Sequence, residues 1–195
     1  KLLSAPKFGN DDDYVDEFAK FLSDTFMGEV EKYQSGRGGH LVGGFFTLSS
    51  TVPLGHETPA TPDGRKARTP ISDSLSPTNG VEENGPTAVL CSCAKIDHTR
   101  CTAGNAVNIK FSPGALESAG KLGKFANLLY TYLVDMHGFE VQVNVVSADT
   151  LRAAQKHPEE YRDLIIRVAG YSARFVELAP DIQEDLITRT EHQMV

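Results

Sequence analysis

The stretch "DLIIRVAGYSARFVEL", residues 163–178, places a glycine inside an otherwise apolar pattern. Aliphatic residues run up to Val168, and Gly170 is followed by Tyr171 and Phe175. A glycine inside a strand is destabilising by about 0.5–1 kcal/mol relative to alanine, because its backbone loses more conformational freedom on folding. A tight turn or a close approach to the backbone is the usual reason for such a glycine. The stretch therefore predicts two strands joined by a buried turn at Gly170.

The composition of the 195 residues is ordinary for a globular protein, with 40% hydrophobic and 23% charged residues. The net charge is −7 and charges of both signs are interspersed, which argues against a nucleic-acid or anionic-membrane partner. No apolar run reaches the roughly 18 residues of a membrane span. Three closely spaced cysteines favour a reducing cytoplasm over a disulfide scaffold. Because the chain opens on Lys1 rather than methionine, we expect a portion of a longer cytoplasmic protein.

Hydrophobic periodicity predicts alternating helices and strands, as in an α/β protein. Residues 139–146 alternate strictly, with valines on one face and Glu140, Gln142 and Asn144 on the other. Ser147 is expected to cap the next helix. Residues 55–88 are rich in turn signals and are expected to form a functional loop or one packed on a partner surface. The expected helices cover 11–34, 112–138, 148–157, 158–164 and 180–192, and the expected strands cover 41–55, 87–96, 104–111, 139–146 and both sides of Gly170.

The cysteines are the first candidates for chemistry. Cys91, Cys93 and Cys101 would need His98 as a fourth ligand to form a metal site. Structural zinc usually takes four ligands with a C-x-x-C spacing, which these residues lack. The sequence therefore favours small buried side chains, and we expect no metal.

Two polar segments are further candidates, each with a structural alternative. Arg65 and Lys66 lie on the Pro-Asp-Gly turn of "TPDGRKA" and would either grip an anion or stay solvated. Thr47 and Ser49 are candidates for facing a substrate pocket, with structural hydroxyls in a buried strand as the favoured alternative. The sequence has no phosphate-binding glycine loop, paired histidine motif or nucleophile elbow. These residues alone indicate that Gly170 is a turn glycine. They show no recognisable set of catalytic residues.

Two segments near the end of the chain, "RVAGYSARF" (167–175) and "QEDLITRTEH" (183–192), resemble the C-terminal signature of the glycyl radical enzymes. The segments "ATPDGRKA", "ISDSLSPTNG" and "NGPTAVLCSCAKIDH" are similar to that family as well. The resemblance implies that Gly170 is the modified glycine, which carries an unpaired electron on its Cα atom. It also implies that an activating enzyme reads the flanking residues of the loop, namely Arg167, Val168, Ala169, Tyr171 and Ser172.

The resemblance further implies how the radical is made and used. A radical S-adenosylmethionine activase with an iron–sulfur cluster installs it, and the chain itself binds no cofactor. The glycyl radical oxidises a cysteine to a thiyl radical, which attacks a small organic substrate. In the dehydratase-like members that cysteine lies in a Gly-Cys-x-Glu motif, which none of the three cysteines here matches. The catalytic cysteine is therefore expected upstream of this sequence or on a partner chain.

For the fold, the resemblance implies late strands and helices of a ten-stranded α/β barrel, followed by a glycine radical domain. Residues 1–72 are assigned to the end of the barrel domain and residues 73–195 to the radical domain. The expected protein is the C-terminal portion of an oxygen-sensitive dehydratase or lyase of anaerobic metabolism, homodimeric when whole. Two alternatives remain, a stand-alone subunit that repairs an oxygen-damaged partner and a non-catalytic domain.

Overall fold

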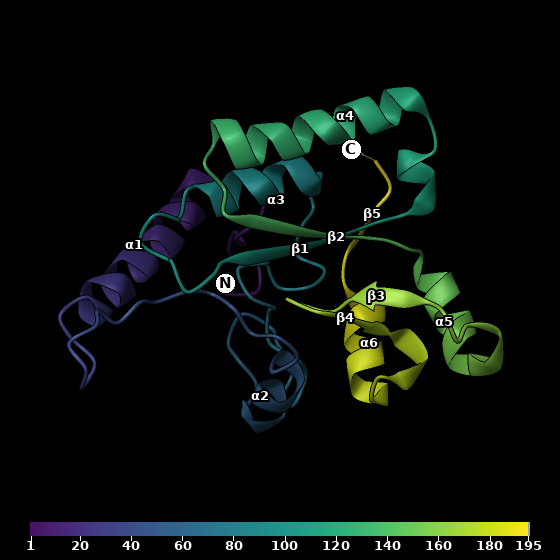
Figure 1. The fold of residues 1–195 in the computed structure, drawn as a ribbon, viewed down its shortest axis with the longest axis horizontal. Coiled ribbons are helices and arrows are strands. Elements are labelled where there is room, and N and C mark those ends of the chain that lie inside the picture. The colour runs from purple at the N-terminus through teal and green to yellow at the C-terminus, as the bar shows by residue number, and fades with distance from the viewer. Residues whose placement is uncertain (195) are drawn as a thin grey trace.

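The computed structural model describes residues 1–194, and a sheet of three parallel strands runs through its middle (Figure 1). The strand order is β2-β1-β5, with β1 at Ala106–Phe111, β2 at Glu140–Val145 and β5 at Glu191–His192. β1 pairs with β2 along its whole length, from Ala106 opposite Glu140 to Phe111 opposite Val145. Strands β1 and β2 confirm the strands expected at 104–111 and 139–146.

Helices cover both sides of this sheet. In Figure 1, α3 and α4 lie along one side, whereas α5, α6 and a β-hairpin lie on the other. The six α-helices are α1 (Asp13–Val30), α2 (Thr51–Glu57), α3 (Gly85–Ala94), α4 (Ala119–Tyr130), α5 (Ala148–Lys156) and α6 (Pro180–Thr188). Shorter helical turns are η1 (Pro113–Leu116), η2 (Thr131–Asp135), η3 (Pro158–Glu160) and η4 (Phe175–Glu177). Among residues 1–194, no helix combines the length and apolarity needed to cross a membrane.

Side chains cap the starts of α1 and α5, and the sequence predicts the cap of α5. The Asp12 carboxylate accepts a hydrogen bond from the Tyr14 N–H at the start of α1. The Ser147 hydroxyl accepts one from the Thr150 N–H at the start of α5. Such caps satisfy amide groups that the first helical turn leaves without a partner. The predicted role of Ser147 is confirmed.

The buried apolar residues form two separate clusters. The first lies between the sheet, α3 and α4, and its members run from Met27 to Tyr132 along the chain. The second starts at Val146 and ends at Ile187, so it belongs to α5, α6 and the hairpin. The last part of the chain thus has a core of its own. The predicted boundary between residues 72 and 73 stays a prediction.

Two predicted strands are wrong. Residues 87–96 form most of α3, which begins at Gly85 with φ +82° and has Pro86 in its first turn. α3 buries residues on several sides, so its apolar run could not be told from a buried strand by periodicity. Residues 41–55 hold only an isolated bridge from Phe45 to Asn105 and then enter α2.

Three predicted helix limits also differ. Residues 158–164 contain only the turn η3, and the last helix ends at Thr188 so that Glu191 and His192 can join the sheet as β5. The helical segment predicted to reach residue 138 ends with η2 at Asp135, and His137 then takes a left-handed conformation with φ +58°. A Cβ atom on Gly138 would lie 2.4 Å from the Tyr132 ring, so close packing explains this glycine.

One face of α1 is apolar and faces outward. Its buried residues are Asp16, Ser23 and Met27. Five large apolar side chains of α1 are 46–68% exposed, namely Tyr14, Phe18, Phe21, Leu22 and Phe26. A contiguous apolar surface of this kind marks an interaction site.

Candidate functional site

Gly170 lies at the tip of a β-hairpin. Strands β3 (Ile165–Arg167) and β4 (Ser172–Arg174) pair antiparallel, and the Val168 N–H donates to the Tyr171 carbonyl at 2.9 Å to close the turn. Gly170 has φ +79°, in the left-handed region that residues with a side chain rarely adopt. The strand–turn–strand predicted around Gly170 is confirmed.

Two apolar side chains from a distant segment cover this glycine. A Cβ atom built on Gly170 would lie 2.1 Å from Cζ of Phe46 and 3.1 Å from Cδ2 of Leu48. Real Cβ atoms essentially never approach another heavy atom within 3.0 Å. Leu48 itself has φ +53°, an unusual conformation for a leucine. Two features therefore require a glycine at position 170: the turn needs a positive φ, and Phe46 and Leu48 approach the Cα atom closely.

The polar face of β2 holds the hairpin from the sheet side. The Gln142 Oε1 atom accepts hydrogen bonds from the Gly170 N–H at 2.8 Å and from Nε of Arg167 at 3.0 Å. Asn144 bonds the Arg167 backbone twice, because its Nδ2 donates to the carbonyl at 2.7 Å and its Oδ1 accepts from the N–H at 2.9 Å. We call Gln142 and Asn144 the amide clasp.

The sequence predicted the alternation of β2 but not the role of its polar face. Gln142 is only 5% exposed, whereas Phe139 and Val145 on the other face are 46% and 47% exposed. Two side-chain amides at alternate positions of a strand were the signal in the sequence. An amide carries both donor and acceptor groups, so it can bond a neighbouring backbone in the way a strand does.

A buried arginine ties the hairpin to the rest of the molecule. The Arg189 guanidinium lies 3.1 Å from the Asp73 carboxylate and 2.9 Å from that of Asp185, and it donates to the Val168 carbonyl at 2.6 Å. Burial raises the pKa of the Asp185 carboxyl, and the charge of Arg189 opposes that shift. Arg189 therefore links α6, the turn before Gly170 and the "ISDSLSPTNG" segment. No local sequence pattern indicates this contact.

We expect Arg189→Met to lower the free energy of unfolding by about 3–5 kcal/mol, because it leaves two buried carboxylates without their cation. The matched control is Arg174→Met in the same hairpin. Arg174 is exposed and pairs with Glu177 at 3.3 Å, so its loss should cost less than about 1 kcal/mol. Urea denaturation measures both changes. Equal stability of the two variants would contradict the role assigned to Arg189.

The residues that flank Gly170 differ in exposure. Val168 and Ala169 are buried, Tyr171 is half-buried and Ser172 is exposed. Arg167 turns its guanidinium toward β2, where its Nε contacts the amide clasp. The two sides of the glycine therefore present different surfaces.

The other candidates lie near this hairpin or have structural partners. Thr47 sits between Phe46 and Leu48, and its hydroxyl accepts a hydrogen bond from the Ser74 N–H at 2.9 Å. Ser49, next to Leu48, is partly buried. The segment that carries both hydroxyls thus covers the glycine, and Thr47 anchors it to the 73–75 loop.

The cysteines do not form a cluster with His98. Its Nε2 contacts the Cys93 carbonyl at 3.1 Å and its Nδ1 contacts the Asn105 amide at 3.1 Å, so both ring nitrogens have partners. Cys93 and Cys101 are fully buried, and burial raises the pKa of the Cys93 thiol. Within residues 1–194, the one group with metal-ligand spacing is the exposed trio of His157, Glu159 and Glu160.

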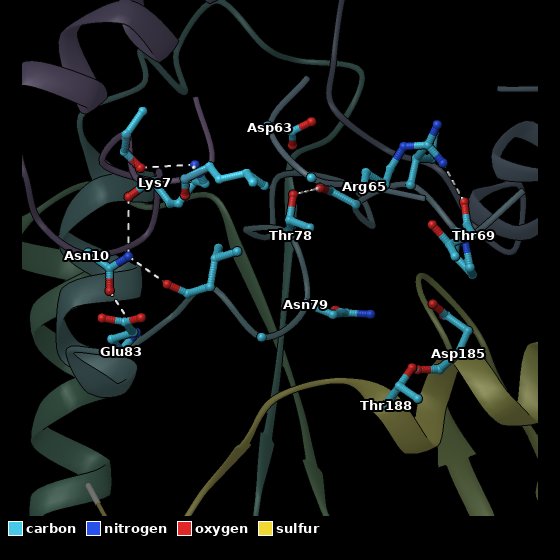
Figure 2. A pocket seen from close by; sticks show the side chains of 18 of the residues that line it. Lys7, Asn10, Asp63, Arg65, Thr69, Thr78, Asn79, Glu83, Asp185 and Thr188 are labelled. Atoms are coloured by element: carbon cyan, nitrogen blue, oxygen red, sulfur yellow. Dashed lines mark hydrogen bonds between the residues drawn. The ribbon is translucent and has the colours of Figure 1, made fainter. Parts of the chain in front are cut away.

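A cavity of about 1030 Å³ separates α6 from the N-terminal segment and the 63–84 loop. Figure 2 shows Arg65 directed at Thr69, and its guanidinium donates to the carbonyls of Thr69 at 2.7 Å and Thr58 at 3.2 Å. Arg65 is therefore neither a free anion ligand nor a solvated turn residue. It holds the "TPDGRKA" loop closed.

The fold and the site together define a class of protein. Its members have an α/β fold in which a glycine at a hairpin tip lies under apolar side chains. A family model described as "Glycine radical" matches residues 71–176, and one described as "Pyruvate formate lyase-like" matches residues 1–55. The chain belongs to the glycyl radical enzyme family.

Relatives of known sequence and structure agree with this assignment. The "Probable dehydratase YbiW" of Escherichia coli is 43% identical over 99% of this chain and 25% of its own length. The isethionate sulfite-lyase of Bilophila wadsworthia is 40% identical over the whole chain and 24% of its own. The B12-independent glycerol dehydratase of Clostridium butyricum superimposes with a TM-score of 0.95 at 47% identity, over 99% of this chain and 24% of that one. The chain spans about a quarter of the length of these relatives, and the predicted fold class is confirmed.

Proposed function

We propose that Gly170 stores a radical and passes it to a cysteine outside this sequence, within a dehydratase or lyase. The observation that carries this proposal is the hairpin tip itself, where a glycine with φ +79° lies against Phe46 and Leu48. The family match extends over this hairpin, and its relatives are named as dehydratases and lyases.

The chemistry of the backbone explains why a glycine suits this task. An amide nitrogen on one side and a carbonyl on the other delocalise an unpaired electron on Cα when all three groups are coplanar. A side chain would hinder that planarity. At φ +79° the preceding peptide is turned out of this plane, so radical formation requires rotation about the N–Cα bond of Gly170. Phe46 and Leu48 cover the tip in part.

The partner of Gly170 must come from outside residues 1–195. Cys93 and Cys101 are buried in the first cluster, and none of the three cysteines has the expected motif. The exposed apolar face of α1 supports docking against a further portion that carries the thiyl cysteine and most of the substrate pocket. The proposed whole enzyme is cytoplasmic and homodimeric, and it acts on a small organic substrate that Thr47 and Ser49 face.

The proposed source of the radical is a radical S-adenosylmethionine activase. Ser172 is exposed and Tyr171 half-buried, so these two residues of the loop are accessible to a docking protein. Val168 and Ala169 are buried, and Arg167 is bonded to β2. The activase therefore reaches all five flanking residues only after the hairpin leaves its place.

Isotopic labelling tests the proposed function. We define the complemented protein as this chain together with the portion that carries the cysteine. After activation it should show a doublet by electron paramagnetic resonance, because a glycyl radical keeps one hydrogen on Cα. Growth with Cα-deuterated glycine should collapse the doublet to a narrow line. A doublet that survives deuteration would place the radical on another residue type.

A further inference from the structure

The hydrogen bond between Gln142 and the Gly170 N–H extends the proposed function, on which this inference rests. We propose that Gln142 is a positioning residue for Gly170, which fixes the amide of the radical-bearing glycine against the sheet. The Oε1 atom of Gln142 lies 2.8 Å from the Gly170 nitrogen, and the side chain is 5% exposed. Asn144 supports it from two residues further along β2.

The orientation of the Gln142 amide follows from its other partner. Its Nε2 donates to Oε1 of Glu140 at 2.6 Å, and a carboxylate can only accept. The Gln142 oxygen must therefore face the opposite way, toward the Gly170 N–H and Nε of Arg167, which are both donors. All polar atoms of this buried side chain have partners.

The strand beneath the amide clasp is the firmer of the two supports of the hairpin tip. β2 is paired with β1 over all of its residues, so the backbone of Gln142 is held in place within the sheet. The covering side chains on the other side, Phe46 and Leu48, are 41% and 44% exposed. Partly exposed side chains change rotamer within nanoseconds. Gln142 therefore sets the position of Gly170, and Phe46 and Leu48 seal it.

This bond has two consequences for the radical. An acceptor on the N–H increases electron donation from the amide nitrogen, which favours the unpaired electron on the adjacent Cα. The same bond must break before the hairpin can leave the sheet. Loss of the Gln142 oxygen should therefore make Gly170 easier to reach, both for an activating protein and for dioxygen.

Amide hydrogen exchange of the unactivated complemented protein tests the positioning role without any radical. In Gln142→Leu we expect the Gly170 amide to exchange about 10-fold faster, since the loss of a buried hydrogen bond favours local opening. The control is Gln183→Leu, which removes bonds to the carbonyls of Phe175 and Leu178 in the same unit. The control should leave exchange at Gly170 within twofold of the parent.

A reversed pair serves as the conservative rescue. The double variant Gln142→Glu with Glu140→Gln keeps an acceptor toward Gly170 and a donor–acceptor pair along β2, so it should restore slow exchange. Unchanged protection of the β1 amides shows that each variant is folded. If Gln142→Leu leaves the Gly170 amide as protected as in the parent, the inference is overturned.

The activated protein supplies a second readout. In Gln142→Leu the doublet should decay at least several-fold faster in air than in the parent or in Gln183→Leu. A faster amide exchange without any doublet in the parent would contradict the proposed function and leave the positioning role intact. A parent doublet with equal decay in all variants would contradict the inference alone.

Discussion

Air admitted to the activated complemented protein will cut this chain at Gly170 and release a peptide of about 25 residues, Tyr171–Val195. The radical is on the main chain, so dioxygen that adds to the Cα atom leads to scission of the backbone there. Phe46 and Leu48 cover the tip but are themselves partly exposed, so dioxygen can reach it. We expect near-complete cleavage of those chains that carried the radical.

The released peptide should remain bound until the protein is unfolded. Lys110 donates to the carbonyls of Leu186 at 3.3 Å and Ile187 at 2.8 Å, and Arg189 pairs with Asp73 across the cut. The measurement is therefore mass spectrometry under denaturing conditions. Unactivated protein exposed to air is the control and should stay whole. Intact chains after a measured radical signal has decayed would place the radical elsewhere.

The second large effect is loss of the radical in Gly170→Ala. A Cβ atom would lie 2.1 Å from the Phe46 ring, and alanine in the left-handed region costs about 1–2 kcal/mol. Phe46 is partly exposed and can move aside, so we expect a folded protein that is less stable by a few kcal/mol. It should show no doublet after activation and no cleavage in air.

Gly80→Ala is the matched control for the backbone. Gly80 has φ +83°, close to that of Gly170, but nothing lies within 4 Å of the added Cβ. Its cost in stability should be that of the backbone alone, and its radical yield should equal that of the parent. Adding Phe46→Ala to Gly170→Ala should recover the steric part of the cost without restoring the radical. A doublet in either variant at position 170 would contradict the assignment.

The sequence by itself determined the elements whose signals are local. The turn at Gly170, the strand at 139–146, the cap at Ser147 and the helix over α1 each depend on residues within a few positions of one another. The family could also be inferred from the sequence, because the segments around Gly170 are a chemical signature rather than a packing pattern. Capping, periodicity and turn chemistry act over such short distances, so they can be read without knowledge of the neighbours.

Only the tertiary structure decided which faces are covered. The apolar run of 87–96 forms α3, which is packed on several sides. The valines of β2 pack on the first cluster, and its polar face is covered as well because the hairpin lies on it. Arg189 pairs with Asp73, which lies more than a hundred residues earlier in the sequence, and no local pattern predicts that contact. The apolar face of α1 is exposed because no other part of the described chain lies against it. Burial depends on what lies opposite a residue, and that is a property of the assembled chain rather than of any segment.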